Sequence, residues 1–376
     1  MSEKASTIQV VKPQTIGQRR WKKFKTIKRG YYSLLILSVL YALSFLLPIL
    51  VNNKALIVKY NGEYYFPAFK SLIASVPLVD NVVSTFQSGE SLGQKGNSGD
   101  CHYRELRVQY QNEQGDNFVI MPIYPFNPIE DITTEGNLAF AEPLTSPDNI
   151  HTRILGTDEN GRDVFARMSY GFQVSITFAL LLVFVEYMIG IPIGGLLGYK
   201  GGWVDLILQR FIEMWSTLPV LFLIIIVVSF VQPNFLLLVL LLSLTAWIPI
   251  TIYIRAEFLR EKSKDYVAAA ISIGVPTWKI MFKHILPNSL VPIVTNFPFA
   301  IVAGLSALVS LDFLGFGLPP PTPSWGQMLS TGLQNITKWW LVFSPMFALF
   351  TTLIMIVFIG EAIREAFDPK TFSRLR

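Results

Sequence analysis

Six apolar segments of about twenty residues or more constrain this chain more than any other feature of its sequence. A helix of that length crosses the hydrocarbon core of a bilayer, and backbone groups in lipid must find hydrogen-bond partners within their own segment. We therefore expect each segment to be a transmembrane helix. The predicted spans are residues 31–50, 172–198, 211–231, 235–254, 290–311 and 339–360.

The composition agrees with a membrane protein. Of the residues, 51% are hydrophobic and 15% are charged, whereas soluble domains carry about 25% charged residues. The first span is longer than the apolar part of a signal peptide and no small-residue cleavage site follows it, so we expect it to remain as an anchor. The single cysteine, Cys101, cannot form an internal disulfide and says nothing about the redox compartment.

The basic residues predict the orientation. Nine of the 31 Lys and Arg residues precede residue 30, directly before the first span, which predicts a cytoplasmic N-terminus. Six spans return the C-terminus to the same side, together with the basic loop 255–289. The basic residues expected at the C-terminus are Arg364, Lys370, Arg374 and Arg376. The alternative, a nucleic-acid-binding arm, is disfavoured because the basic run lies against an apolar segment.

These signals divide the chain into five parts. We expect a cytoplasmic basic tail (1–30), the first transmembrane helix (31–50), an external insert (51–165), a core of five spans (166–362) and a cytoplasmic tail (363–376). The fold class is thus an all-α integral membrane protein with a large external insert between helices 1 and 2.

Part of the insert is expected to be β. The alternating residues of Tyr103–Tyr110, followed by Phe118–Ile120, predict a hairpin, and Tyr64–Phe66 predicts a further short strand.

The predicted cytoplasmic loop contains a pattern typical of two short helices. Three alanines at 268–270 favour a helix, and Asp265 at its start suits the helix dipole. Gly274 is placed to end this helix, and Pro276 fits the first turn of the next. The alanines would let a partner approach the helix backbone closely, as in helix-in-groove recognition. The alternative is an ordinary connection between two spans.

This loop resembles the cytoplasmic "EAA" signature of ABC importer permeases, a pattern of Glu-Ala-Ala, three residues, Gly, and later Ile-x-Leu-Pro. Ala269, Ala270 and Gly274 match it, as do Leu286 and Pro287. The chain departs from the pattern at Ala268, which replaces the Glu, and at His284, which replaces the Ile. Tyr266-Val267 and the run from His284 to Asn288 resemble the oligopeptide and dipeptide branch, the OppC/DppC family.

Three other stretches resemble the same branch. Residues 155–163 (Leu-Gly-Thr-Asp-Glu-Asn-Gly-Arg-Asp) are similar to the segment before the permease core, and 314–326 to the external segment after the fifth span. Arg29-Gly30-Tyr31 and the insert around 60–67 look most like the Yej-type peptide permeases. The resemblance covers nearly the whole chain.

The resemblance implies a bacterial inner-membrane, multi-pass permease subunit that moves solute by alternating access. It also implies a heterodimer with a second related permease, two ATP-binding subunits carrying ATP-Mg, and a periplasmic solute-binding protein. No cofactor, metal or catalytic residue is expected on this chain. Peptides are the expected cargo, although related branches carry nickel and glutathione.

Three groups of residues are candidate sites. The ATPase-coupling loop would use Asp265, Tyr266, Ala268, Ala269, Ala270, Gly274, Leu286 and Pro287. An external mouth that contacts the binding protein would use Gly315, Gly317, Pro321 and Trp325, with a rigid connecting loop as the alternative. Glu186 is a possible intramembrane polar site, because ionisable groups within spans are usually functional. A structural bond to a neighbouring helix is the alternative for Glu186.

Other polar and small residues have structural interpretations. Asp158 or Asp163 would cap the following helix, and Gly190, Gly194, Gly195 and Gly198 favour close helix packing. Glu213 and Asp312 lie near span ends, where we expect contact with water.

Two other classes of membrane protein are the alternatives. A secondary transporter or channel would carry inverted repeats or several intramembrane charges, and an intramembrane enzyme would need a nucleophile and base. The sequence contains no Gly-x-x-x-x-Gly-Lys-Ser/Thr phosphate loop, and its three histidines are scattered.

Overall fold

The computed structural model describes residues 15–69, 88–97, 99–113, 115–130, 139–145 and 152–367. Residues before 15, and the expected C-terminal basic residues Lys370, Arg374 and Arg376, lie outside this part. The N-terminal helices are α1 (Ile16–Thr26), α2 (Lys28–Ser44) and α3 (Leu47–Leu50). The helices of the core are α6 (Val164–Lys200), α7 (Gly202–Ser216), α8 (Val220–Phe230), α9 (Phe235–Lys262), α10 (Asp265–Ser272), α11 (Thr277–Lys279), α12 (Leu290–Phe313), α13 (Trp325–Gln334) and α14 (Trp339–Phe367).

Within the described residues, four helices are long and apolar enough to cross a membrane: α6, α9, α12 and α14. The helices α7 and α8 together form a fifth candidate, bent by 65°. The first predicted span is divided between α2 and α3, and α2 has 17 residues. The chain is therefore a multi-pass helical membrane protein, and the count of six spans stays a prediction.

The prediction of one uninterrupted helix over 211–231 is wrong. The chain breaks at residues 217–219, because Pro219 has no N–H for a helical hydrogen bond and ends the preceding helix. Residues 232–234 separate α8 from α9, and the Asn234 side chain caps α9 by accepting a bond from the Leu237 N–H.

Helices α6 and α9 are in backbone contact along a row of glycines, as the spacing predicted. A Cβ added at Gly194 would lie 2.5 Å from the carbonyl oxygen of Thr251, and one at Gly198 would lie 2.5 Å from that of Arg255. The Thr251 hydroxyl also donates to the carbonyl of Gly190 at 3.2 Å. Only glycine allows so close an approach.

The insert contains a small three-stranded sheet in the order β2-β1-β3, with β1 (Ile57–Tyr60) pairing antiparallel with both β2 (Glu63–Tyr65) and β3 (Phe118–Ile120). The predicted strand near Tyr64 is confirmed. The predicted hairpin is wrong, since residues 103–113 form helix α5 (Tyr103–Glu113).

The spacing of the buried residues explains that error. Tyr103, Leu106 and Tyr110 lie three and four residues apart, so they share one helix face, and this face is buried against the sheet. The alternation of Leu106, Val108 and Tyr110 matched a strand over only five residues.

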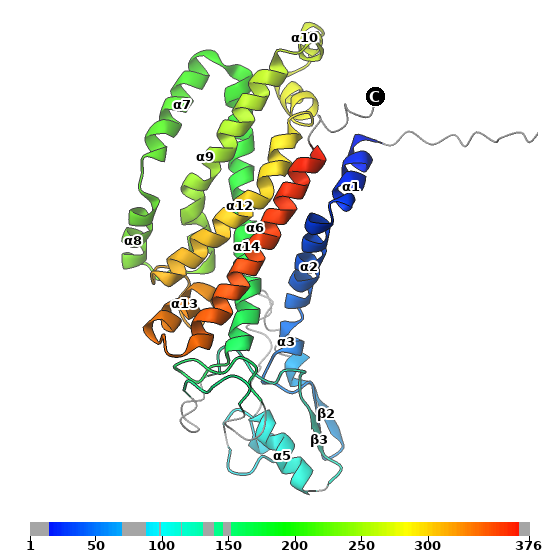
Figure 1. The fold of residues 1–376 in the computed structure, drawn as a ribbon, viewed down its shortest axis with the longest axis vertical. Coiled ribbons are helices and arrows are strands. Elements are labelled where there is room, and N and C mark those ends of the chain that lie inside the picture. The colour runs from blue at the N-terminus through cyan, green and yellow to red at the C-terminus, as the bar shows by residue number, and fades with distance from the viewer. Residues whose placement is uncertain are drawn as a thin grey trace, which may run out of the picture.

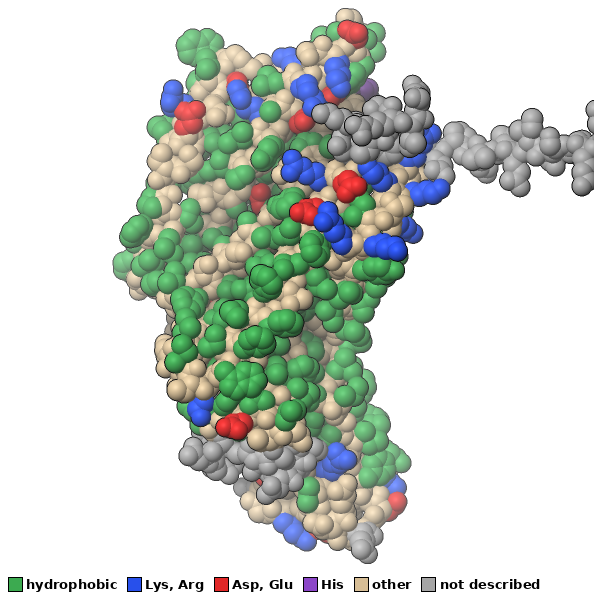
Figure 2. Space-filling model, viewed as in Figure 1, with side chains coloured by type: hydrophobic (Ala, Val, Ile, Leu, Met, Phe, Trp, Pro, Cys, Tyr) green, Lys and Arg blue, Asp and Glu red, His purple; other side chains and the backbone are tan. Residues whose placement is uncertain are grey.

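The elements are arranged along one long axis, with the insert and α13 toward one end and α10 and α1 toward the other (Figure 1). The C-terminal end of α14 also lies near α1, where Lys23 donates to the carbonyl of Glu365 at 2.8 Å. In the view of Figure 2, charged side chains gather toward the two ends, and the band between them is mainly hydrophobic. Such a band fits a bilayer core.

Candidate functional site

The knob, residues 265–287, lies at the end of the molecule opposite the insert (Figure 1). Helix α10 spans the first part, and Gly274 follows it with a φ of +76°, which glycine adopts without strain. Pro276 directly precedes α11, and a π-helical turn, η3 (Ile280–Ile285), continues it. The predicted pair of short helices is thus present, the second partly π-helical.

The knob presents apolar side chains at its surface. Ala268 and Ala269 are exposed, whereas Ala270 is buried. Ile273 is 79% exposed and Trp278 is 66% exposed. Exposed apolar groups on a short helical element are typical of a surface that a partner covers. Of the other predicted coupling residues, Asp265, Tyr266 and Pro287 are exposed and Leu286 is half-buried.

Glu261 anchors the start of the knob, and sequence reasoning missed it. Its carboxylate is 1% exposed, accepts a hydrogen bond from the Tyr266 hydroxyl at 2.8 Å, and pairs with Lys264 at 2.6 Å. Asn288 donates to the same Tyr266 hydroxyl at 3.3 Å. Burial and the neighbouring carboxylate raise the pKa of Tyr266 above its usual value. The sequence signal was present, since Glu261 is an acid in a basic loop.

A buried cluster joins the knob to the membrane helices. Val267 and Ala270 of α10 and Ile280 of η3 pack together with Ile254 and Phe258 of α9. Phe258 in turn lies against Gly195 of α6, where an added Cβ would be 3.0 Å from its ring. The knob is therefore in close-packed contact with α9, and through Phe258 with α6.

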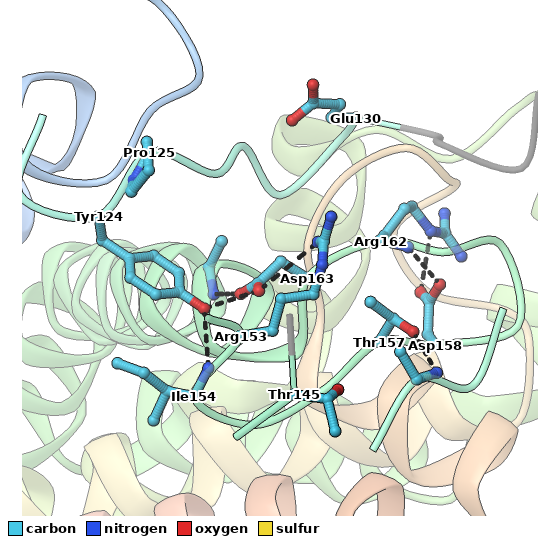
Figure 3. Close-up of polar contacts among 12 residues, drawn as sticks. Tyr124, Pro125, Glu130, Thr145, Arg153, Ile154, Thr157, Asp158, Arg162 and Asp163 are labelled. Carbon is cyan, nitrogen blue, oxygen red and sulfur yellow. Dashed lines mark hydrogen bonds and ion pairs between the residues drawn. The ribbon is translucent and has the colours of Figure 1, made fainter. Parts of the chain in front are cut away.

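The collar, residues 152–163, closes the opposite end of α6 with buried polar groups (Figure 3). Asp163 is the N-cap residue, as predicted, and accepts from the Ala166 N–H at 2.8 Å. It also accepts from the Tyr124 hydroxyl at 2.7 Å and lies 3.9 Å from the fully buried Arg153. Arg153 stacks on Phe126, 4.3 Å from the ring centre. The network therefore ties the insert to the core.

Asp158 closes the turn of the collar. It accepts from the backbone N–H and the side chain of Arg162 and pairs with Arg167 at 3.6 Å. Gly156 and Gly161 have φ values of +70° and +71°, which glycine adopts readily in tight turns.

The buried Asp163 carboxyl should make the stability of the folded protein depend on pH. Burial raises its pKa to about 6. Since the folded state holds the proton more tightly than the unfolded state, its contribution to stability falls as the pH rises from about 4 to above 6. We expect the difference in melting temperature, Asp163→Asn minus wild type, to be higher at pH 7 than at pH 4.5. The measurement is thermal unfolding of the purified protein. A difference that stays constant between the two pH values would contradict this.

Two of the four residues predicted for the external mouth are exposed, and the other two are buried. Gly315 and Pro321 are exposed, whereas Gly317 is buried and Trp325 is 1% exposed. Trp325 donates to the carbonyl of Met168 at 3.0 Å, so it supports the mouth from within the core and offers no surface to a partner. A cavity of about 450 Å³ opens here between the collar, the 315–320 segment and α13.

The expectation that water surrounds Asp312 is wrong. This carboxylate is 3% exposed and accepts from the Ser324 hydroxyl at 2.5 Å and the Leu318 N–H at 2.7 Å. It holds the mouth segment to the end of α12. Glu213, by contrast, is half-exposed and pairs with Arg210 at 2.7 Å.

Glu186 lines a second cavity, of about 450 Å³, between helices α6, α8, α9 and α12. The polar residues that line it with Glu186 come from three of these helices: Tyr187, Thr245, Tyr253 and Asn296. Sequence reasoning selected Glu186 but missed the other four, since an isolated Thr, Asn or Tyr in an apolar span carries no pattern.

No group of three or more His, Cys, Asp or Glu side chains in the described part of the chain is placed to hold a metal ion. Cys101 is buried in the insert, where burial raises the pKa of its thiol to about 12. A thiol with so high a pKa is a weak nucleophile at neutral pH.

Comparison with known proteins agrees with this geometry. Residues 190–373 match the family described as binding-protein-dependent transport system inner membrane component. The chain is 35% identical, over 99% of both chains, to a peptidoglycan transport system permease protein YejE of Agrobacterium fabrum. It is 38% identical to the inner membrane ABC transporter permease protein YejE of Escherichia coli, over 94% of this chain and 97% of that one.

A third relative, the oligopeptide transport system permease protein OppC of Haemophilus influenzae, is 36% identical over 63% of this chain and 75% of its own length. With relatives above 30% identity along nearly their entire length, the chain belongs to the family of membrane permease subunits of ABC importers.

Proposed function

We propose that this chain forms half of a peptide-translocating pore and is driven by separate ATPase subunits that press on the knob. The observation that carries the proposal is the knob itself, whose exposed apolar surface is joined by a buried cluster to α9 and α6. A force applied there would tilt these helices against their neighbours, which is the motion that alternating access needs.

The proposal sets the orientation. The knob and the basic helix α1 face the cytoplasm, where ATP is available, and the insert and the mouth face the outside. A second, related permease would complete the pore, and an external solute-binding protein would deliver the solute to the mouth. ATP-Mg would be bound by the two ATPase subunits.

The peptide class is supported by the relatives' names. Two of the relatives described above are named for oligopeptide and peptidoglycan transport, and both substances contain peptide bonds. Peptides are therefore the cargo proposed for this chain.

The test is uptake of a labelled peptide into vesicles that hold both permeases, the ATPase subunits and the binding protein. We expect uptake with ATP and none when ATP or the ATPase subunits are left out, because this chain would only receive the force. Uptake that persists without the ATPase subunits, and follows an ion gradient instead, would indicate a secondary transporter and refute the proposal.

A further inference from the structure

Glu186 is a carboxylate without a partner inside a membrane cavity. It lies near the middle of α6, is 8% exposed, and has no hydrogen bond or ion pair with any described residue. An ionisable group at this depth is costly unless it pairs or serves a solute. Its small exposed area faces the cavity, so a solute inside the cavity is within its reach.

The chemistry of the cavity favours a cation. Among the described residues that line it, Glu186 is the one acidic residue, and no Lys, Arg or His is present. Thr245 and Pro249 also line the cavity. Since Pro249 has no N–H to donate, the carbonyl of Thr245, four residues earlier, loses its usual helical partner and is a second acceptor.

The other polar side chains of this cavity are uncharged, and two of them donate hydrogen bonds to backbone carbonyls. The Tyr187 hydroxyl donates to the carbonyl of Ile293 at 3.2 Å, and the Asn296 amide donates to that of Pro292 at 2.8 Å. The cavity wall is therefore rich in acceptors, the Glu186 carboxylate above all, which suits an ammonium group with several N–H donors.

We propose that Glu186 is the solute-contact residue of this permease and binds the α-ammonium group of a passing peptide. This inference rests on the proposed function and deepens it, since it names the group of the cargo that the pore itself recognises.

The cavity continues toward the knob end of the molecule. An adjoining cavity, of about 380 Å³, shares Tyr253, Asn296 and Phe299 with the Glu186 cavity and reaches Arg364 near the end of α14. A peptide that leaves Glu186 along this route would pass from an acidic to a basic environment.

The test compares Glu186→Gln with wild type in the complete transporter, reconstituted with its binding protein. The probes are labelled tri-alanine and N-acetylated tri-alanine, which differ only in the α-ammonium group. We expect the substitution to lower tri-alanine uptake about tenfold, as for loss of one charge-assisted hydrogen bond, and to leave the acetylated peptide within about twofold of wild type. The binding protein's own preference cancels in each variant-to-wild-type ratio.

Other outcomes are decisive. Equal loss for both peptides would mean a structural partner for Glu186, such as a residue of the second permease, and unchanged uptake of both would mean no contact; either overturns the inference. Wild type that imports neither peptide with ATP contradicts the proposed function itself. The control Glu213→Gln, which removes a carboxylate that does not line the cavity, should change neither uptake.

A second measurement covers the case in which wild type imports only tri-alanine. A hydrophobic carbodiimide should label Glu186 in the purified complex, identified by peptide mapping and by loss of the label in Glu186→Gln. Tri-alanine should protect Glu186 from labelling more than acetylated tri-alanine does. Equal protection by the two peptides would overturn the inference.

Discussion

Replacing Gly274 with tryptophan is expected to abolish ATP-driven uptake while the protein still inserts into the membrane. Gly274 is exposed, and nothing lies within 4 Å of the position that a Cβ would occupy, so the new side chain creates no clash inside the subunit. Its effect would instead fall on the outer surface of the knob, where the proposed ATPase contact lies. The measurement is peptide uptake together with ATPase activity in the same vesicles.

Backbone strain must be separated from loss of docking. The φ of +76° at Gly274 makes any larger residue cost about 1 kcal/mol. Gly96, in the insert, is a matched control, because it is also exposed, has a φ of +79° and nothing within 4 Å of an added Cβ. Gly96→Trp should therefore keep uptake, whereas Gly274→Trp should lose it.

A smaller side chain at position 274 should reduce uptake less than tryptophan does. Gly274→Asn keeps a residue that tolerates a positive φ and projects little, so we expect it to retain most of the uptake. Normal uptake by Gly274→Trp, in vesicles with wild-type amounts of the chain, would exclude docking at this surface.

Replacing Gly194 with leucine is expected to prevent normal folding of the core. A Cβ at this position would lie 2.5 Å from the carbonyl oxygen of Thr251 and 3.0 Å from the Cβ of Ile254. The first of these is backbone, which cannot rotate away, so α6 and α9 must separate. Overpacking of a core costs about 1–3 kcal/mol and occasionally more, and we expect the upper end here.

The measurement is thermal unfolding and size-exclusion chromatography of the purified protein in detergent. Gly194→Ala should show a smaller loss than Gly194→Leu, since it adds only the first carbon. Met188→Leu, at a position on the same helix that is 65% exposed, is the control and should behave as wild type. A melting temperature of Gly194→Leu equal to that of the control would show that the helix contact tolerates bulk.

Sequence patterns predicted those parts of the fold that depend only on residues close together in the chain. Apolar length predicted the helices α6, α9, α12 and α14. Gly274 ended its helix because a positive φ stops a helix wherever it occurs. The Asp163 cap needed only its own side chain and the N–H three residues later.

Patterns failed where a distant segment decided the outcome. Residues 103–113 matched a strand over five positions, yet they form α5 because the β-sheet offers an apolar surface for one helix face. Asp312 lies near a span end, but the chain folds back so that Ser324 and Leu318 bury it.

The sequence by itself determined that this chain is a helical membrane protein of the ABC importer permeases, with a glycine-ended helix in its basic loop. Hydrophobic length and backbone conformation are properties of short segments, so a reader of the sequence has access to them. Only the tertiary structure decided which polar groups lie together, because such groups come from helices far apart in the chain. Glu186, Thr245 and Asn296, which line one cavity from α6, α9 and α12, are an example.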